Sequence, residues 1–564
     1  MDVEAATFFR PSVWIDRLVF SGGDEVTFEP RDKVLIVGAN NSGKSRTLRE
    51  IDELCSQGNH ASQRVVLKQI ELKKFGERSD LESYLRANAT VVDSTYRLKD
   101  WTFHVSHVQF WEQNYLVNGL AGGFVRNITA KDRLQICEQQ PSIAPNEPMT
   151  RPQHVLYQDD RLMARVSDLF RRSFNADLMF DFKGGSRLPI HVGDVPSGAE
   201  YADRASDEYV SAVRRLPLLD AQGDGMKSFA GILFETVAST RDVTFLDEPE
   251  AFLHPPQMRR IGETLAQEAS GQLFVATHSS DVLRGFLEGS KGNVRIMRIR
   301  REDSKNFIFE APADAVRELW SKPSLRYSNA LEGVFHEQTI ICEDDSDCRL
   351  FNAVASFLEA HSSRPWKDTA YIPTGGKAAV RKVAAVLRQV GVPIKAVFDI
   401  DFLSDRVMVK ETVEAFGGKW GDVENHWLRV DLAVRKGVKA KSVAEIKEEV
   451  KKILDASGAD KLPKGRINDE LKQNSPWAIV KRIGEAAIPA GDAQKEYAQL
   501  RESLQAIGIY LVPTGEAEGF CRQIGNHGPT FVTSLLTEIP LEDPSLDPLR
   551  AFVERVHLGP ASTN

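Results

Sequence analysis

The stretch from Gly38 to Ser45 constrains the fold most. It reads G-A-N-N-S-G-K-S and fits the pattern G-x-x-x-x-G-K-S. An apolar run, residues 34–37, precedes it and predicts a buried strand, whereas the residues from Ser45 onward predict a helix. The two glycines allow the backbone to wrap around a phosphate, with amide N–H groups pointing inward at the helix N-terminus. This strand–loop–helix order predicts an α/β fold with a nucleotide site.

The same loop supplies the predicted nucleotide ligands. Lys44 can reach the outer phosphates, and the Ser45 hydroxyl can ligate magnesium. The other loop residues expected around the nucleotide are Gly38, Asn40, Asn41, Ser42 and Gly43. A chance glycine-rich turn is the alternative, and a full octet between strand and helix argues against it. ATP with Mg²⁺ or Mn²⁺ is therefore the predicted cofactor.

A second part of that site is predicted far downstream, in residues 241–255, RDVTFLDEPEAFLHP. Asp247 ends a β-rich run and is expected to hold magnesium through water, while Glu248 orients or deprotonates the attacking water. Another apolar strand, residues 272–277, leads to His278, which is expected to touch the γ-phosphate. A lone histidine is more often structural, but its place about 30 residues after the acid pair favours a catalytic role.

A second acidic cluster lies in ICEDDSD, residues 341–347, where a strand predicted over residues 339–342 ends. Carboxylates this close repel one another unless a cation joins them. Downstream, KAVFDIDFLSD places Asp399 and Asp401 two residues apart, and residues two apart share one face of a strand. Carboxylates without a nearby His or Cys suit Mg²⁺ or Mn²⁺. The alternative is an acidic turn with an unrelated surface D-x-D.

Composition sets limits on these interpretations. The 564 residues suffice for two to four domains, and no apolar span of 18 residues is present, so no membrane helix is expected. The N-terminal residues lack a basic region followed by an apolar run, and no signal peptide is expected. Five scattered cysteines predict reduced thiols in a cytoplasm and no zinc framework. A net charge of -8 gives no global attraction to nucleic acid, which must bind through a local basic face or metal ions.

The first set of motifs resembles the ABC-type ATPases, in the soluble branch that contains SMC-like and OLD-family proteins. The resemblance covers roughly residues 12 to 300. It implies a signature segment in residues 221–233, where Gly223, Gly225 and Ser228 would form an amide-lined helix start. In that family this segment completes the nucleotide site of a second protomer, so a homodimer or higher homo-oligomer is implied.

Other parts of this resemblance stay open. His254 stands where the family has a dimer-contacting loop, and Gln109 and Gln158 are both candidates for its glutamine loop. Residues 46–215 are too short for a long coiled coil and show no sustained heptads. Within them, residues 104–111 predict a strand and residues 159–174 a helix.

The second set of motifs resembles the TOPRIM domain, because strand–Glu, helix, strand–GGK, helix and strand–DxD follow in that order. The resemblance implies that Glu343, Asp399 and Asp401 are the core metal ligands and that Asp347 is the helix-start acid. Two such ions activate water and stabilise the leaving oxygen in phosphodiester cleavage. That family has glycine after the glutamate, whereas this chain has Asp344, so the turn there cannot rely on the backbone freedom of glycine.

Three further features carry weaker predictions. Gly515 to Glu518 resembles the G-x-x-E segment of OLD-family nucleases, so Glu518 is a predicted metal ligand and Glu516 a weaker candidate, with solvated loop acids as the alternative. Lys377 is expected to contact a phosphate or neutralise the acids, unless it is a surface lysine. A mildly basic helical insertion, about residues 406–508, either touches a nucleic-acid backbone or is a solvated face.

Together the motifs predict an ABC-type ATPase domain in residues 1–320 and a Rossmann-like TOPRIM domain with a helical insertion in residues 321–564. This order resembles OLD-family ATP-dependent nucleases. It implies an ATP-hydrolysing, metal-dependent endonuclease in the cytoplasm, acting in antiphage defence with a possible partner protein, with DNA favoured over RNA. One alternative is an ATPase sensor or scaffold with a degenerate TOPRIM region. Another is a DNA-repair ATPase of the recombination-mediator kind.

Overall fold

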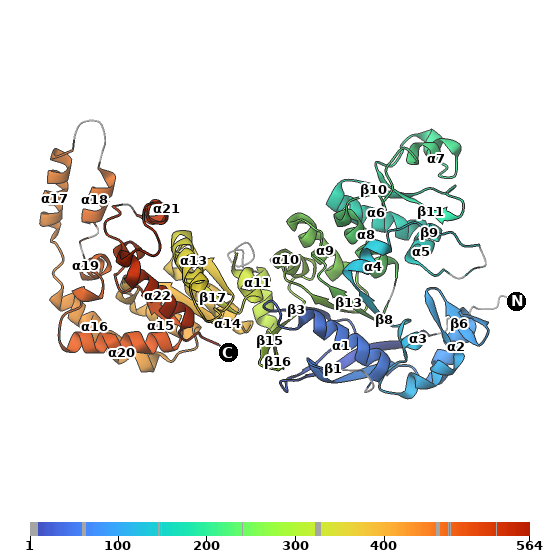
Figure 1. Cartoon of the computed structure of the whole chain (residues 1–564), viewed down its shortest axis with the longest axis horizontal. Coiled ribbons are helices and arrows are strands. Elements are labelled where there is room, and N and C mark those ends of the chain that lie inside the picture. The colour runs from blue at the N-terminus through green and yellow to red at the C-terminus, as the bar shows by residue number, and fades with distance from the viewer. Residues whose placement is uncertain are drawn as a thin grey trace. The chain divides into compact units, whose positions relative to one another are not determined.

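The computed structural model describes residues 9–58, 64–144, 147, 149–239, 241–321, 329–457, 463–471, 473, 475–525 and 527–563. The chain divides into two compact units, Met1–Arg326 and Tyr327–Asn564. In Figure 1 the first unit runs from blue to yellow-green and the second from yellow to red. Among the helices described, none is both long and apolar enough to span a membrane.

A six-stranded sheet forms the centre of the first unit, in the order β16-β15-β3-β14-β13-β8. All neighbours are parallel except β16, which runs antiparallel to β15. The strands are β3 (Lys33–Val37), β8 (Val125–Ile128), β13 (Val243–Asp247), β14 (Gln272–Ala276), β15 (Arg295–Glu302) and β16 (Lys305–Glu310). β3 and β14 are almost wholly buried, and strands covered on both faces read as unbroken apolar runs.

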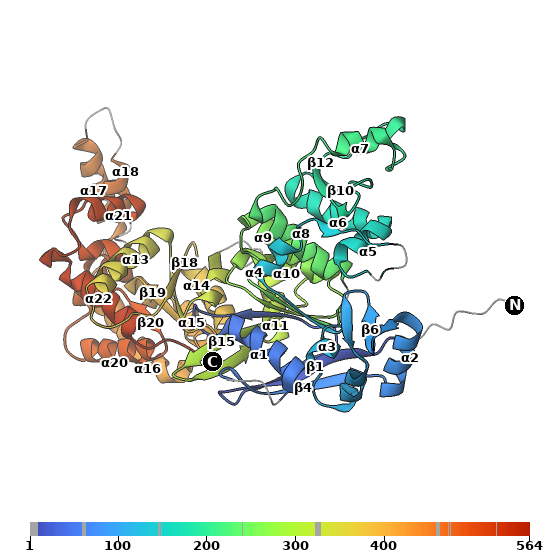
Figure 2. The ribbon, with the colours of Figure 1, turned by 45° about the vertical axis from the view of Figure 1, so that its right-hand side comes forward.

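Different layers cover the two faces of this sheet. Below it in Figures 1 and 2 lie α1 (Lys44–Gln57) and an antiparallel sheet of β2 (Glu25–Thr27), β1 (Ser12–Phe20) and β4 (Leu67–Phe75). Alternate strand residues such as Val34 and Phe245 share a buried core with Leu48 and Ile51 of α1. Above it lie α8 (Asp224–Leu233), α9 (Pro255–Glu268) and α10 (Ser280–Gly289). The loops at the carboxyl ends of β3, β13 and β14 are therefore set on a rigid scaffold.

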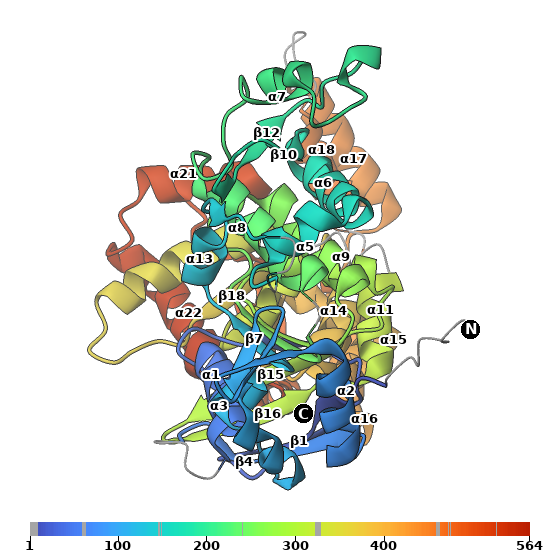
Figure 3. The same ribbon diagram turned by 90° about the vertical axis from the view of Figure 1, so that its right-hand side faces the viewer.

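The remaining elements of this unit extend from that centre. The helices are α2 (Arg78–Asn88), α3 (Asn118–Ala121), α4 (Ala130–Gln135), α5 (Pro152–Gln158), α6 (Asp160–Phe174), α7 (Asp207–Val213) and α11 (Ala313–Ser321). The strands are β5 (Thr90–Val92), β6 (Thr95–Leu98), β7 (Trp101–His104), β9 (Gln140–Pro141), β10 (Asp177–Phe180), β11 (Arg187–Leu188) and β12 (Ile190–Gly193). Figure 3 shows α6 and α7 at the end of the unit opposite β1 and β4.

A four-stranded parallel sheet forms the centre of the second unit, in the order β18-β17-β19-β20. The strands are β17 (Gln338–Cys342), β18 (Thr369–Pro373), β19 (Ile394–Phe398) and β20 (Ile509–Leu511). Helices α13 (Asp345–Ala360), α21 (Gly528–Glu538) and α22 (Asp547–Leu558) share one buried core with it, and α14 (Lys377–Gln389) packs against β17 and β19. The carboxyl ends of four parallel strands thus meet at one edge.

Helices fill the chain between β19 and β20. They are α15 (Arg406–Ala415), α16 (Trp420–Gly437), α17 (Val443–Asp455), α18 (Lys464–Leu471), α19 (Pro476–Ile483) and α20 (Asp492–Ala506). Helix α16 packs along α20, and α17 packs against α18 (Figure 1). Helix α19 packs on the 3₁₀ turn Ile400–Ser404 that follows β19. The insertion therefore brings α19 to the edge where β19 ends.

Candidate functional site

The loop between β3 and α1 has the geometry of a phosphate cradle. Gly38 and Gly43 have φ values of 143° and 106°, and a Cβ at Gly38 would lie 2.4 Å from the carbonyl oxygen of Ile299. Both positions therefore require glycine. Asn40 and Asn41 are exposed, whereas Ser42 is buried and its hydroxyl lacks a partner among the described residues.

Lys44 is folded back on this loop. Its ammonium group donates to the carbonyl oxygens of Gly38 at 2.7 Å and Ala39 at 2.8 Å, and its side chain is buried. Burial lowers the pKa of Lys44 to about 8, against the opposing pull of Glu248, Glu250 and Asp247. A phosphate in the loop would supply the negative charge that this buried cation lacks.

The predicted partners downstream meet the loop. The Ser45 hydroxyl donates to Asp247 Oδ1 at 2.9 Å, so the two predicted magnesium ligands lie side by side. Burial raises the pKa of Asp247, and the bond from Ser45 opposes that shift. His278 Nε2 lies 3.4 Å from Glu248 Oε1, and both side chains are substantially exposed. Burial and then the nearby Lys44 lower the pKa of His278, which favours its neutral form.

Two residues that were not predicted from the sequence, Arg133 and Glu250, contact the backbone of the acid pair and of His278. Arg133 of α4 is fully buried and donates to the backbone oxygens of Asp247 and Glu248. Glu250 accepts hydrogen bonds from the Thr277 hydroxyl and the His278 backbone N–H. Glu250 could have been predicted, because it is the third acid of the segment D-E-P-E, residues 247–250. No sequence pattern around Arg133 indicates its role.

The signature segment lies on α8, whose N-cap is Gly223. Ser228 is in the second turn, fully buried, and its hydroxyl donates to the Ala251 carbonyl oxygen at 3.2 Å. In this conformation Ser228 therefore faces its own chain, and Gly223 and Gly225 are the residues at the helix start. A Cβ at Gly225 would lie 2.7 Å from the Phe252 carbonyl oxygen.

The remaining candidates of the first unit are on its surface. His254 is exposed at the N-cap of α9. Gln109 and Gln158 are exposed, in the 3₁₀ helix Val105–Glu112 and at the end of α5. Among the described residues, neither glutamine hydrogen-bonds to the loop or to the acid pair, and the choice between them stays open.

In the second unit the predicted acids gather where the parallel strands end. Glu343 follows β17, and its Oε1 accepts the Asp399 backbone N–H at 3.3 Å. Asp399 follows β19 as the N-cap of a 3₁₀ turn, and Asp401 lies in that turn, so the prediction that they share one face of a strand was wrong. The turn nevertheless brings the two carboxylates close to each other, and Lys481 contacts both of them.

Two lysines neutralise part of this cluster. Lys377, at the start of α14, forms an ion pair with Asp401 and lies 3.8 Å from Glu343 Oε1. Lys481 of α19 lies 2.6 Å from Asp399 Oδ2 and 3.8 Å from Asp401 Oδ1. The sequence analysis included Lys377 but not Lys481, which is 80 residues from Asp401 and carries no motif.

The aspartate in place of glycine does not strain the turn. Asp344 has φ -139° and ψ 178°, an extended conformation that any residue adopts. Its Oδ1 accepts the N–H groups of Ser346 at 2.7 Å and Asp347 at 3.1 Å, so it caps α13. The side chain thus helps to start the helix that carries Asp347.

Burial and crowding shift the pKa values of these acids. Burial, then the charge of Asp399, raises the pKa of Glu343 to about 7. Burial, then Asp344, raises the pKa of Asp347 to about 8. Burial also raises the pKa of Asp399, although Lys481 opposes it. Burial would lower the pKa of Lys481, but Asp399 and Asp401 hold it above its ordinary value.

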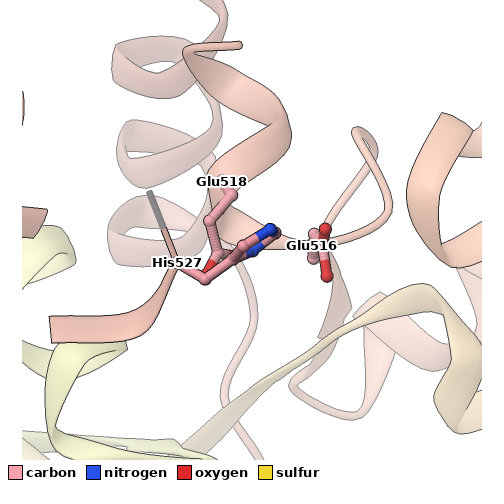
Figure 4. A group of neighbouring side chains, drawn as sticks. All are labelled: Glu516, Glu518 and His527. Carbon is pink, nitrogen blue, oxygen red and sulfur yellow. The ribbon is translucent and has the colours of Figure 1, made fainter. Parts of the chain in front are cut away.

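A third group of ligand atoms lies close by. One ligand atom from each of Glu516, Glu518 and His527 lies within 4.8 Å of the others, and Figure 4 shows the three side chains turned toward one another. Glu518 Oε1 also accepts the Gly528 N–H at 2.8 Å. His527 was not predicted, because it lies nine residues after Glu518 and therefore outside the G-x-x-E pattern. These residues, Glu343 and the D-x-D pair all line one cavity of about 1070 Å³.

Comparisons with known proteins agree with the motifs. Residues 145–284, which include Asp247, Glu248 and His278, match the family described as "AAA domain, putative AbiEii toxin, Type IV TA system". A curated relative, the Old nuclease of Escherichia phage P2, is 23% identical over 174 residues, 29% of each chain. The predicted resemblance to the OLD family is confirmed.

That match spans less than a third of the OLD-family relative's own length. Among solved structures, an SMC head bound to the C-winged helix domain of ScpA is 13% identical, with a TM-score of 0.33 over 53% of this chain and 97% of that one. The SMC head domain from Thermotoga maritima is 12% identical, with a TM-score of 0.29 over 53% and 99%. The predicted α/β class is confirmed by the largely parallel sheets of both units and the helices that cover them.

Proposed function

We propose that this chain is an ATP-hydrolysing, metal-dependent nuclease whose two activities reside in its two units. The observation that carries the nuclease is the cavity of about 1070 Å³ at the carboxyl edge of the parallel sheet, lined by Glu343, Asp347, Asp399 and Asp401. Ligand sites of open α/β sheets lie at that edge. The βαβαβ order and the D-x-D pair support assignment of this unit as a TOPRIM domain.

The residues of the cavity fit a divalent cation. The donors are carboxylate oxygens, which suit Mg²⁺ or Mn²⁺, and the acids are crowded enough that burial and mutual repulsion raise the pKa values of Glu343 and Asp347. Glu343, Asp347, Asp399 and Asp401 would hold metal, with Glu518 as a further ligand. Bound metal would supply activation of water and stabilisation of the leaving oxygen. Lys377 and Lys481 would then be available for a phosphate of the nucleic acid.

In the first unit ATP is the proposed nucleotide. The N–H groups of Gly38 to Ser45 and the ammonium group of Lys44 would hold its phosphates, and Ser45 with Asp247 would hold its Mg²⁺. Glu248 would orient or deprotonate the attacking water, and His278 lies beside it to contact the γ-phosphate. The start of α8, where Gly223 is exposed and Gly225 is half-buried, would complete the site of a second copy, which makes the proposed active form a homodimer.

The sensor or scaffold alternative loses its main support. It rested on Asp344 in a glycine position as a sign of a degenerate site. An extended backbone at Asp344 needs no glycine, and the side chain caps α13. The nuclease is therefore the better proposal, and antiphage defence is its proposed setting, with DNA as the favoured nucleic acid.

The test is cleavage of supercoiled plasmid by the purified protein with Mg²⁺ or Mn²⁺, with and without ATP. The Asp399→Ala and Asp401→Ala variants should lose metal-dependent nicking and keep ATP hydrolysis. Asp492→Ala, at a side chain that is 97% exposed, is the matched control and should cut like the wild type. Loss of ATP hydrolysis together with cleavage would argue against two separate sites. Absence of cutting of plasmid, single-stranded DNA and tRNA under all conditions would overturn the nuclease.

A further inference from the structure

Arg133 and Glu250 lie behind the Glu248–His278 pair. Glu248 has a left-handed backbone, with φ 46°. For a residue other than glycine this conformation costs about 1–2 kcal/mol and persists only where the surroundings hold it. Its N–H donates to the Ala276 carbonyl oxygen at 2.9 Å. Its carbonyl oxygen accepts both terminal nitrogens of Arg133 at 3.1 Å each, so both sides of the residue are fixed.

Glu250 fixes the other member of the pair. Its Oε1 accepts the His278 N–H at 2.6 Å, and both of its oxygens lie 3.0 Å from the Thr277 hydroxyl oxygen. The Thr277 oxygen in turn accepts the Ser279 N–H at 3.0 Å. The carboxylate therefore ties the segment that follows the acid pair to the loop that carries His278.

We propose that Arg133 and Glu250 are positioning residues for ATP hydrolysis. They hold the backbones of Glu248 and His278, so that the two side chains stay 3.4 Å apart. This inference rests on the proposed ATPase activity, since neither residue is assigned to the nucleotide or its metal. A displacement of about 1 Å at a catalytic group costs about 100-fold in rate, so loss of either clamp is expected to slow turnover.

The experiment compares Glu250→Gln, Arg133→Lys and Thr277→Val with the wild type. The readouts are kcat and KM for ATP, the Kd of mant-ATP and the thermal unfolding midpoint. Glu250→Gln and Arg133→Lys should lower kcat by about 10- to 100-fold, with KM and Kd changed by less than about twofold. Thr277→Val keeps the side-chain shape and should lower kcat by about 3- to 10-fold, because the hydroxyl bonds to Glu250 and to the Ser279 N–H are lost while the bond from the His278 N–H to Glu250 remains.

Asp181→Asn is the matched control. Asp181 is a buried carboxylate of the same unit that accepts the Lys183 N–H and the Arg214 Nε–H, away from the proposed site. This variant should lose stability and keep kcat. A wild type without ATP turnover would overturn the proposed function itself. An active wild type with folded Glu250→Gln and Arg133→Lys variants at undiminished kcat would overturn the positioning roles alone. If those two variants do not fold, full turnover in Thr277→Val would do the same.

Discussion

Replacing Lys481 by Met tests how the acidic cluster of the second unit holds its charge. Lys481 Nζ lies 2.6 Å from Asp399 Oδ2 and 3.8 Å from Asp401 Oδ1. A divalent cation that binds these carboxylates must first displace the ammonium group. Deleting that group therefore removes a competitor, and the affinity for Mn²⁺ should rise.

The size of the effect follows from the ion pair. Two unit charges about 4 Å apart attract by about 4 kcal/mol at an effective dielectric constant of about 20. Lys481 is 31% exposed, and solvent and side-chain entropy reduce this attraction to a net value of about 1–3 kcal/mol. The Kd for Mn²⁺ should accordingly fall by about 5- to 150-fold in Lys481→Met. Loss of the repulsion between ammonium and metal acts in the same direction.

Isothermal titration of nucleotide-free protein with Mn²⁺ measures this change. Lys495→Met is the matched control, because Lys495 pairs with the surface acid Asp492 at 3.3 Å, and its Kd should equal that of the wild type. Asp399→Asn in the Lys481→Met background should abolish the gain, which assigns the heat to this cluster. Unchanged or weaker Mn²⁺ binding by a folded Lys481→Met variant would refute the competition argument.

Three further predictions concern stability. Glu50→Gln should lower the free energy of unfolding of the first unit by about 2–4 kcal/mol in urea titrations, because the buried carboxylate accepts the N–H groups of residues 65–67; an unchanged midpoint would contradict this. Lys395 is buried with a pKa lowered to about 7 by burial, so the folded state binds fewer protons than the unfolded state from about pH 7 to 10. Wild-type stability relative to Lys395→Met should thus rise by up to about 2 kcal/mol from pH 7 to 9, and a constant difference would show that Lys395 does not titrate there. Gly231→Ala would place a Cβ 2.2 Å from the Arg133 carbonyl oxygen. The variant should therefore lose about 1–3 kcal/mol of stability in thermal unfolding and should also hydrolyse ATP with a lower kcat. Unchanged stability and unchanged kcat would show that α8 and α4 move apart easily.

The centres of both units follow closely from the sequence. The strands predicted over residues 34–37 and 339–342 are confirmed as β3 and β17, each one residue longer at its start. The helix predicted over residues 159–174 is confirmed as α6, with Asp159 as its N-cap. These elements could be predicted because a buried parallel strand needs an unbroken apolar run, and a surface helix needs a 3.6-residue period.

The strand predicted over residues 104–111 was wrong. Only His104 belongs to a strand, and Val105–Glu112 forms a 3₁₀ helix. The His104 side chain accepts the Ser106 N–H, which caps this helix. The buried residues Val108 and Trp111 are three apart, which is the period of a 3₁₀ helix and not of a strand. The three-residue spacing of the apolar residues is present in the sequence. The segment was nevertheless predicted as a strand, because its composition is rich in residues that favour strands.

The parts of the sites that were missed depend on contacts between distant segments. The acids carry motifs because their own neighbours form the strand ends that present them. Lys481, Arg133 and His527 act through their places on α19, on α4 and before α21, which only the packing of those elements fixes. No local pattern marks Lys481 or Arg133, because their partners lie 80 to 115 positions away along the chain and come close only in the folded protein. His527 lies nearer to its partners, 9 and 11 positions after Glu518 and Glu516, but outside the G-x-x-E pattern.

The cavity at the carboxyl edge of the sheet in the second unit is strongly acidic, and its charge bears on the binding of both metal and substrate. Seven carboxylates line it, from Glu343, Asp344, Asp347, Asp399, Asp401, Glu516 and Glu518, and among the described lining residues only Lys481 and Arg482 are permanently cationic. A nucleic-acid backbone carries one negative charge per phosphate and would be repelled from this lining. The raised pKa values of Glu343 and Asp347 lower the charge only in part near neutral pH. A nuclease built on this cavity must therefore gain positive charge before it binds its substrate, and divalent cations on the carboxylates supply that charge. Under the proposed function, metal would thus be needed for substrate binding as well as for the chemical step, and raising Mn²⁺ in steps should lower the Kd for a nucleic acid even in a variant that cannot cut.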